Sequence, residues 1–121
     1  MAGEKIKIVI VDDERDLCFL LSGILKSNGY DVHTFYTLHE GLEGISAVRP
    51  DWVILDNDLP DGLGWSKTGE LLNNYPHINI INISANPDSH RSYYPSQVFY
   101  LIKPIDVNSI LALISNSQAA S

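Results

Sequence analysis

The fold of this chain is decided by the stretch Val53-Ile54-Leu55-Asp56-Asn57-Asp58-Leu59-Pro60-Asp61-Gly62, in which an apolar run is followed by a segment that contains three aspartates. The apolar run is typical of a strand buried on both faces, and the segment after it is typical of a loop. Asp56 is therefore expected at the C-terminal end of a strand. In an open α/β sheet, the loops that leave these ends form the ligand crevice.

Four other segments share the β-branched and apolar character of a strand. Together with the first, they predict strands at 6–11, 32–35, 52–55, 78–83 and 98–102. The segment at 32–35 is the shortest and most polar, which favours an edge position. Helical patterns lie between the strands, so the chain is expected to form a parallel sheet covered on both faces by right-handed crossovers. Periodicity leaves the strand order open.

The helices are marked by apolar spacing and by capping residues. Thr37 followed by Glu40 fits a capping box, and Asp106 fits an N-cap. The segment at 87–95 is bracketed by prolines and has room for one or two helical turns at most. The apolar stripes expected to face the core are Leu17, Leu20, Leu21, Ile24 and Leu25; Leu38, Leu42, Ile45 and Val48; Trp65, Leu71 and Leu72; and Val107, Ile110, Leu111 and Ile114.

Length and charge limit the classes of protein that fit. The 121 residues are expected to form a single domain, 1–121, with its core at about 5–114. A formal charge of −7 argues against direct binding to nucleic acid or to an anionic membrane. No apolar run approaches the roughly 20 residues that span a bilayer, and the N-terminus lacks the apolar region of a signal peptide. With Cys18 as the single cysteine, a cytoplasmic protein is expected.

Polar residues follow four of the five predicted strands. They are Asp12 and Asp13, Asp56, Ser84 and Lys103. Each has an ordinary structural explanation when taken alone, as a helix first turn, a turn hydroxyl or a solvated lysine. Because the C-terminal ends of parallel strands share one edge of the sheet, these groups are expected to converge into one site.

Such a site has definite chemical requirements. Two carboxylates about 4 Å apart repel by roughly 4 kcal/mol at an effective dielectric constant of about 20, so a cluster of acids needs a cation. Oxygen ligands with room for water suit Mg²⁺. A carboxylate can attack a phosphoryl group to form an acyl phosphate, and an ammonium group can stabilise the transferring oxygens.

These motifs resemble the receiver domain of two-component response regulators, the CheY-like superfamily, from about Lys5 to Ile114. The matching residues are Asp12-Asp13, Asp56 in Leu-Asp-x-x-Leu-Pro-x-Gly, Ser84 in Ile-Ser-Ala, and Lys103-Pro104. The resemblance implies an α/β fold, a flavodoxin-like three-layer sandwich with a five-stranded parallel sheet in the order 2-1-3-4-5. The segment between Ser84 and the fifth strand implies a short or irregular fourth helix.

The resemblance also implies the roles of the acidic residues and the lysine. Asp56 would accept a phosphoryl group from a phosphohistidine donor. Asp13, Asp56 and the main-chain carbonyl of Asp58 would bind Mg²⁺, and Asp12 would assist through water. Lys103 would bind a phosphoryl oxygen. The domain would catalyse only its own phosphotransfer and autodephosphorylation, and is not expected to be an enzyme otherwise.

A switch and a partner surface follow from the same resemblance. On phosphorylation, Ser84 would move toward the phosphate and Tyr100 would turn inward, while a cis peptide before Pro104 would hold the neighbouring Lys103. A histidine kinase or histidine phosphotransfer protein would dock on the exposed strip of the first helix, expected at Glu14, Arg15, Cys18 and Ser22, and Phe19 falls off the core stripe. The downstream protein or effector domain is not predicted.

Three alternatives remain open at this stage. An aspartate-nucleophile phosphatase of the haloacid-dehalogenase type uses the same residue types, but it places the nucleophile on its first strand. A flavin-binding domain would need a glycine- and hydroxyl-rich loop where this chain has Asp12-Asp13-Glu14. The third alternative is an interaction module that keeps the fold without being phosphorylated.

Overall fold

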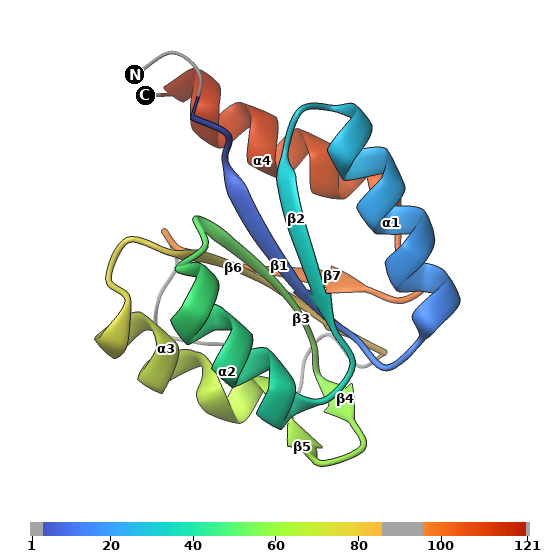
Figure 1. The fold of residues 1–121 in the computed structure, drawn as a ribbon, viewed down its shortest axis with the longest axis vertical. Helices are drawn as coiled ribbons and strands as arrows, with labels where there is room; N and C mark the ends of the chain where they lie inside the picture. The colour runs from blue at the N-terminus through green and yellow to red at the C-terminus, as the bar shows by residue number, and fades with distance from the viewer. Residues whose placement is uncertain (1–3, 86–95, 121) are drawn as a thin grey trace.

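The structure, a computed structural model, describes residues 4–85 and 96–120 (Figure 1). The expected short or irregular fourth helix falls within 86–95 and so lies outside the described residues. The strands are β1 (Lys7–Val11), β2 (Asp31–Phe35), β3 (Trp52–Asp56), β4 (Asp58–Leu59), β5 (Gly62–Leu63), β6 (Asn79–Ser84) and β7 (Val98–Ile102). The helices are α1 (Arg15–Ser27), α2 (Leu38–Val48), the 3₁₀ turn η1 (Gly64–Lys67), α3 (Thr68–Asn74) and α4 (Val107–Ala120).

Five of the strands form one parallel sheet. Its order is β2-β1-β3-β6-β7, which confirms the expected order because β6 and β7 are the fourth and fifth predicted strands. The polar strand β2 lies at one edge, as its sequence predicts. The central strand β3 is buried along its whole length, which explains why its apolar run does not alternate with polar residues.

Helices cover both faces of the sheet, as Figure 1 shows. Successive side chains of a strand point to opposite faces, so Ile8 and Ile10 of β1 join one core with α1 and α4. Val9 and Val11 join the other core with α2 and α3. The result is the expected three-layer α/β sandwich. Within the described ranges, no helix combines the length and the apolar content needed to cross a membrane.

The buried stripe of α1 differs from the predicted one. Leu20 was expected in the core, but 56% of it is exposed. Leu21 and Leu25 are buried as predicted, and the other buried residues of α1 are Cys18 and Ser22. They follow the same helical spacing, but the buried face is rotated by about one residue, because Cys18 and Ser22 are small enough to pack closely against the sheet.

The caps of two other helices agree with the sequence. The Thr37 hydroxyl accepts a hydrogen bond from the Glu40 main-chain N–H (3.1 Å) at the start of α2. The Asp106 carboxylate accepts one from the Asn108 N–H (3.0 Å) at the start of α4. The third helix is shorter than its pattern suggested, because the turn at Trp65 is 3₁₀ and regular α-helix begins only at Thr68.

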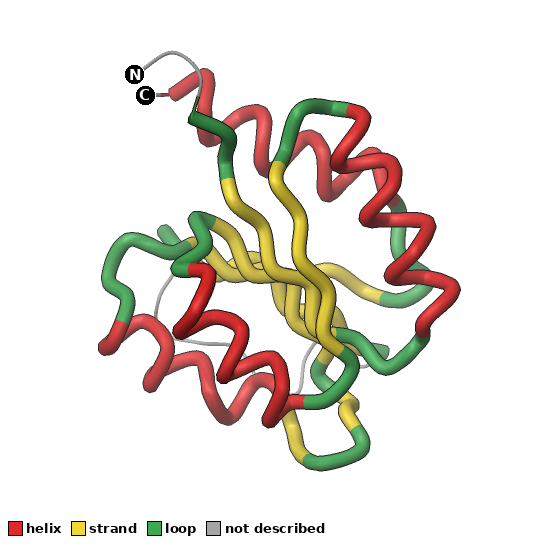
Figure 2. Tube along the Cα trace, viewed as in Figure 1, coloured by secondary structure: helices red, strands yellow, loops and turns green. Residues whose placement is uncertain are grey.

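The loop predicted after β3 contains a small antiparallel hairpin that the sequence analysis did not identify. In it, Asp58 pairs with Leu63 and Leu59 pairs with Gly62. Figure 2 shows this hairpin beyond the end of the main sheet, close to the start of α2. Asn57 and the β4–β5 hairpin therefore lie directly next to the expected site.

The two helical glycines Gly23 and Gly41 give matched tests of this packing. A Cβ at Gly23 would meet nothing within 4 Å, so Gly23→Ala is expected to raise the free energy of unfolding by about 1 kcal/mol through helix propensity. A Cβ at Gly41 would lie 2.6 Å from a methyl carbon of Val11, so Gly41→Ala is expected to lower it by about 1–3 kcal/mol. Urea unfolding of both variants measures the difference, and equal shifts would contradict the packing of α2 on β1.

Candidate functional site

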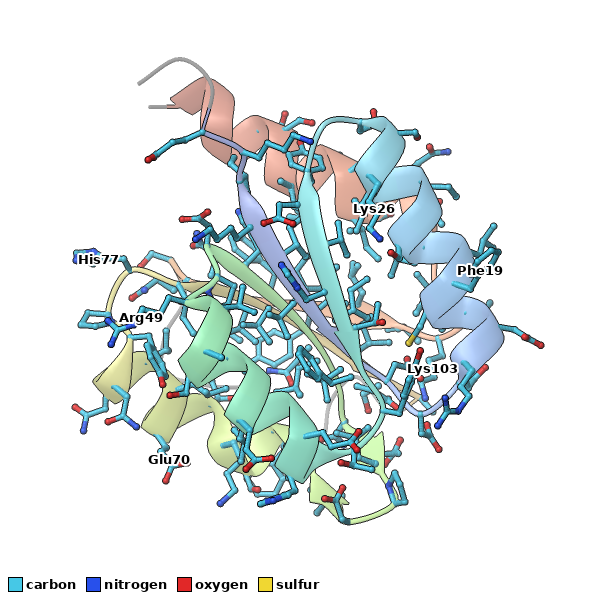
Figure 3. The ribbon with its side chains drawn as sticks, viewed as in Figure 1. Phe19, Lys26, Arg49, Glu70, His77 and Lys103 are labelled. Atoms are coloured by element: carbon cyan, nitrogen blue, oxygen red, sulfur yellow. The ribbon has the colours of Figure 1, made fainter. Side chains whose placement is uncertain are left out.

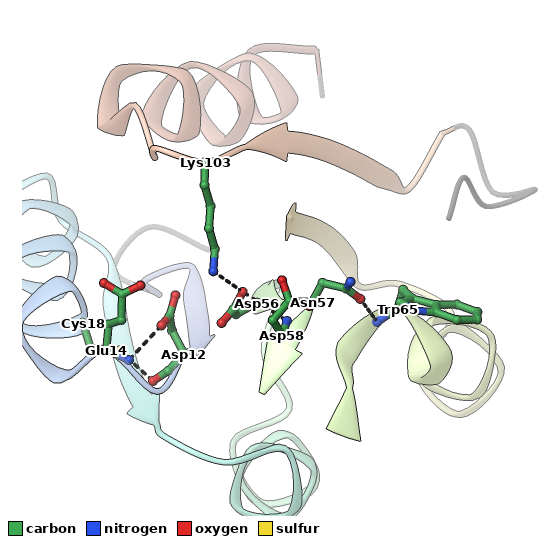
Figure 4. Close-up of polar contacts among 8 residues, drawn as sticks. All are labelled: Asp12, Glu14, Cys18, Asp56, Asn57, Asp58, Trp65 and Lys103. Carbon is green, nitrogen blue, oxygen red and sulfur yellow. Dashed lines mark hydrogen bonds and ion pairs between the residues drawn. The ribbon is translucent and has the colours of Figure 1, made fainter. Parts of the chain in front are cut away.

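The C-terminal ends of β1, β3 and β7 bring three of the predicted residues together (Figure 4). Asp12 follows β1, Asp56 ends β3, and Lys103 follows β7. The Lys103 Nζ lies 3.0 Å from the Asp56 Oδ1, although β6 separates their strands in the sheet. Lys103 therefore reaches across one strand to pair with a carboxylate whose side chain is fully buried.

Three carboxylates form one cluster at this edge. One oxygen each from Asp12, Asp13 and Asp56 can be chosen so that all lie within 4.8 Å of one another. Asp12 and Asp56 are buried, and Asp13 is exposed. The Asp12 Oδ1 accepts a hydrogen bond from the Glu14 N–H (2.9 Å), which fixes this carboxylate at the start of α1.

Burial controls the electrostatics of the cluster. It raises the pKa of Asp12 to about 6 against the opposing effect of the Glu14 hydrogen bond, and the charge of Asp56 adds to the rise. Burial also raises the pKa of Asp56, although the hydrogen bond and charge of Lys103 partly offset it. For Lys103, burial by itself would lower the pKa, but the attraction of Asp56 outweighs it and the pKa is raised.

The residues present fit a divalent cation. The buried Asp56 Oδ2 has no hydrogen-bond partner within the described part of the chain, and such an atom is costly unless a ligand satisfies it. The cluster offers carboxylate oxygens alone, and one lysine does not neutralise three acids. Hard cations such as Mg²⁺ prefer this donor set.

The loop after Asp56 is held at its base by Asn57. The Asp58 N–H donates to the Asp56 Oδ1 (3.3 Å). Asn57 is buried, its main-chain oxygen accepts from the Gly64 N–H (2.9 Å), and its Oδ1 accepts from the Trp65 N–H (3.1 Å). Asn57 is not among the predicted site residues, although a polar residue placed directly after a wholly buried strand was an available signal.

Ser84 and Tyr100 lie on β6 and β7, and Pro104 follows the end of β7. Ser84 ends β6 directly after Ile83, the register partner of Asp56. Its main-chain oxygen accepts a hydrogen bond from the Lys103 N–H (3.0 Å), so the ends of β6 and β7 are joined. Tyr100 lies on β7, half-buried against the core formed with α2 and α3. The peptide bond between Lys103 and Pro104 is cis.

Comparisons with known proteins identify the family. A family model for the response regulator receiver domain matches residues 8–115. This chain belongs to that family.

Named relatives agree with the assignment. The receiver domain is 26% identical over 117 residues to the DNA-binding transcriptional regulator NtrC of Proteus hauseri, covering 94% of this chain and 25% of that protein. It is 30% identical over 115 residues to the uncharacterized transcriptional regulatory protein YvcP of Bacillus subtilis, covering 91% and 47%. A solved two-component response regulator from Clostridium difficile superposes with a TM-score of 0.82 at 25% identity, covering 93% of this chain and 94% of that chain.

The chain is therefore a receiver domain of the two-component response regulators, a family of signalling domains, with the flavodoxin-like fold. Its acidic cluster is the kind of pocket at which receiver domains bind Mg²⁺. None of the matches described above favours the phosphatase, the flavin-binding domain or the unphosphorylated module. The chain spans between a quarter and a half of the length of the two curated relatives, so their whole-protein activities do not transfer to it directly.

The expected docking strip of the receiver domain needs correction. Cys18 and Ser22 are buried, so neither can face a partner. The Cys18 thiol instead donates to the main-chain oxygen of Asp12 (3.3 Å), and burial, together with the charges of Asp12 and its neighbours, raises the pKa of the thiol to about 12. The exposed residues of the strip are Glu14 and Arg15, whose guanidinium carbon lies 4.0 Å from the ring centroid of Tyr36.

The raised pKa of Asp12 predicts how stability depends on pH in the absence of divalent cations. An acid with a raised pKa binds more protons in the folded state than in the unfolded state between the two pKa values. The contribution of Asp12 to the free energy of unfolding is thus greatest below about pH 4, falls between about pH 4 and pH 6 by up to about 3 kcal/mol, and stays low at higher pH.

Urea unfolding in a chelator, compared between the parent and Asp12→Asn, isolates this contribution. The two proteins are expected to be similar in stability near pH 4, and the parent is expected to be the less stable near pH 7. Added Mg²⁺ should restore the parent more than the variant. Stability curves that run parallel across this pH range would show that Asp12 does not titrate as described.

Proposed function

We propose that Asp56 is the phosphoacceptor of this receiver domain. The observation that carries the proposal is the environment of its carboxylate. Asp56 is buried at the end of the central strand, Lys103 lies 3.0 Å from Oδ1, Oδ2 has no partner in the described ranges, and two further acids lie beside it. We take 1–121 as one receiver domain with a core at about 5–114.

The reaction we propose is an in-line transfer. A carboxylate oxygen of Asp56 attacks the phosphorus of a phosphohistidine, a P–O bond forms and the P–N bond breaks. The bonding pair leaves on the imidazole nitrogen. The ammonium of Lys103 is already paired with Asp56, and it would then pair with a phosphoryl oxygen that gains negative charge. Hydrolysis of the acyl phosphate then returns the carboxylate, and we propose no other catalysed reaction.

The cation we propose for the site is Mg²⁺. Asp13, Asp56 and the main-chain carbonyl of Asp58 would hold it, and Asp12 would act through a water molecule. When bound, it would supply positive charge to the transferring phosphoryl oxygens. The buried carboxylates with raised pKa support this assignment, because added positive charge would stabilise their charged forms.

We also propose that Ser84 and Tyr100 transmit the effect of phosphorylation at Asp56 to a protein-interaction surface. Ser84 would turn its hydroxyl to the phosphate, and Tyr100 would turn inward into the space so freed. Their positions support this: Ser84 ends the strand next to Asp56, and Tyr100 lies on the adjacent β7, opposite Asn82 in register. A local charge change would thereby bias a two-state element and a protein-interaction surface.

The phosphoryl donor we propose is a histidine kinase or a histidine phosphotransfer protein of the cytoplasm. Its docking surface would include the outer face of α1, which begins directly after the acidic pair. Phe19 points away from the protein on this helix (Figure 3) and is 83% exposed, and the neighbouring Leu20 is also exposed. Aromatic residues, Phe among them, are enriched in protein interfaces. The downstream partner is unidentified, and the net charge of −7 favours a protein over nucleic acid.

Phosphorylation by a small donor tests the role of Asp56. Incubation with acetyl phosphate and Mg²⁺ is expected to add the mass of one phosphoryl group to the parent, measured on the intact protein. Asp56→Ala should gain nothing, and Lys103→Ala should react at least about tenfold more slowly. An adduct that persists in Asp56→Ala would refute the assignment. Turnover of a phosphate monoester by the parent would support a phosphatase instead.

The docking surface is tested by comparing two donors. Phe19→Ala is expected to slow transfer from a phosphorylated histidine phosphotransfer protein by about tenfold or more, because it removes an interface anchor. The rate with acetyl phosphate should not change, because this donor needs no protein interface. Equal loss with both donors would mean that Phe19 acts on the site itself, and no loss with either would remove it from the interface.

A further inference from the structure

A single side chain ties the hairpin after Asp56 to helix α2. Asp61 lies at the turn of the β4–β5 hairpin, and its Oδ1 accepts a hydrogen bond from the Leu38 N–H (2.7 Å). Its Oδ2 accepts one from the His39 N–H (2.9 Å). These N–H groups belong to the first turn of α2, where they have no partner within the helix. The contact joins segments more than twenty residues apart.

The hydrogen bonds between Asp61 and the first turn of α2 are electrostatically favourable. A carboxylate at a helix N-terminus interacts well with the helix dipole and forms charge-assisted hydrogen bonds. The two donors, His39 first, lower the pKa of Asp61, so its side chain is charged at neutral pH. From its sequence Asp61 is expected only to be a turn residue, because no pattern within its own segment indicates a partner in α2.

The hairpin is fixed at both of its ends. Asn57 closes the base by accepting hydrogen bonds from the N–H groups of Gly64 and Trp65. At the other end, Asp61 is bonded to α2. A Cβ at Gly62 would lie 2.8 Å from a methyl carbon of Leu38, so the hairpin also packs closely on this helix. Asp58, the first residue of the hairpin, lies between these two points of attachment.

We propose that Asp61 is a positioning residue for the phosphorylation site. By bonding the first turn of α2, it holds the hairpin in place and with it the main-chain carbonyl of Asp58. This inference rests on the proposed function, in which that carbonyl binds the divalent cation. In this arrangement α2 and the cation site are coupled through the hairpin, without any contact between α2 and the cation.

Coupling of this kind is reciprocal. If the tie between Asp61 and α2 favours the cation-bound arrangement of the hairpin, then binding of the cation must favour the tie by the same factor. The amide hydrogens of Leu38 and His39 are the donors in that tie. They are therefore expected to exchange more slowly with solvent when Mg²⁺ is bound.

The experiment compares Asp61→Ala, Asp61→Asn and Thr37→Ala with the parent. Thr37 is the matched control, because its hydroxyl caps the same end of α2 by accepting from the Glu40 N–H (3.1 Å) but has no bond to the hairpin. Urea unfolding is measured first, to establish that all the variants fold and how much stability each loses. The dissociation constant of Mg²⁺ alone is then measured by titration calorimetry, and amide exchange by NMR with and without Mg²⁺.

Asp61→Ala is expected to weaken Mg²⁺ binding by at least about fivefold. Thr37→Ala should lose comparable stability and keep the parent affinity. Asp61→Asn retains one acceptor oxygen and should fall between the parent and Asp61→Ala. In the parent, Mg²⁺ should slow exchange at Leu38 and His39, and Asp61→Ala should abolish this effect.

Three results would overturn the inference, and they can be told apart. If the parent binds Mg²⁺ and Asp61→Ala binds it equally well, the hairpin tie does not position the site, while the proposed function stands. If the parent does not bind Mg²⁺, the proposed function fails and the positioning role fails with it. Equal loss of affinity in Asp61→Ala and Thr37→Ala would assign the effect to the stability of α2 alone.

Discussion

The ion pair between Asp56 and Lys103 is the interaction on which the site depends. Asp56 is 1% exposed, and a carboxylate in that position is too costly to keep charged without a partner. Its partner comes from the end of β7, two strands away, and the Nζ–Oδ1 distance of 3.0 Å is possible only if β6 and β7 keep their register. The parallel sheet therefore supplies more than a scaffold, because its strand order brings the cation to the acid.

One lysine does not neutralise the negative charge of the three carboxylates in the cluster. One carboxylate oxygen each of Asp12, Asp13 and Asp56 lies within 4.8 Å of the others. Burial raises the pKa of Asp12 to about 6, and the charge of Asp56 adds to the rise. The domain without a cation thus holds unfavourable free energy at its most buried acids. A cation that is coordinated by these oxygens removes this unfavourable free energy when it binds. For the phosphoryl transfer proposed above, binding of the cation would therefore also prepare the site for the reaction.

The sequence predicts those features that depend on one segment at a time. Strand ends, the cap at Thr37 and the acids at the sheet edge could be read directly, and resemblance added the strand order. The rotation of α1 that buries Cys18 and exposes Leu20 could not be predicted from the sequence, because apolar spacing alone does not choose between stripes one residue apart. The hairpin, the base contact of Asn57 and the tie of Asp61 to α2 were missed for a related reason. Each depends on a partner that is remote in sequence or on the main chain.

Two structures lie next to Asp56, and they differ in how completely their polar groups are hydrogen-bonded. One is the hairpin, which is closed by hydrogen bonds at its base and its tip. The other is the face of β6 and β7 that carries Ser84 and Tyr100, where Asn82 is buried in register with Tyr100. Asn82 donates to the Thr68 hydroxyl at 3.4 Å, but its Oδ1 has no partner in the part of the chain described. A partly satisfied buried amide holds its surroundings less firmly than a complete network does. For the phosphorylation proposed above, rearrangement would therefore be less costly along β6 and β7, whereas the hairpin would be suited to keep the proposed cation ligands in place.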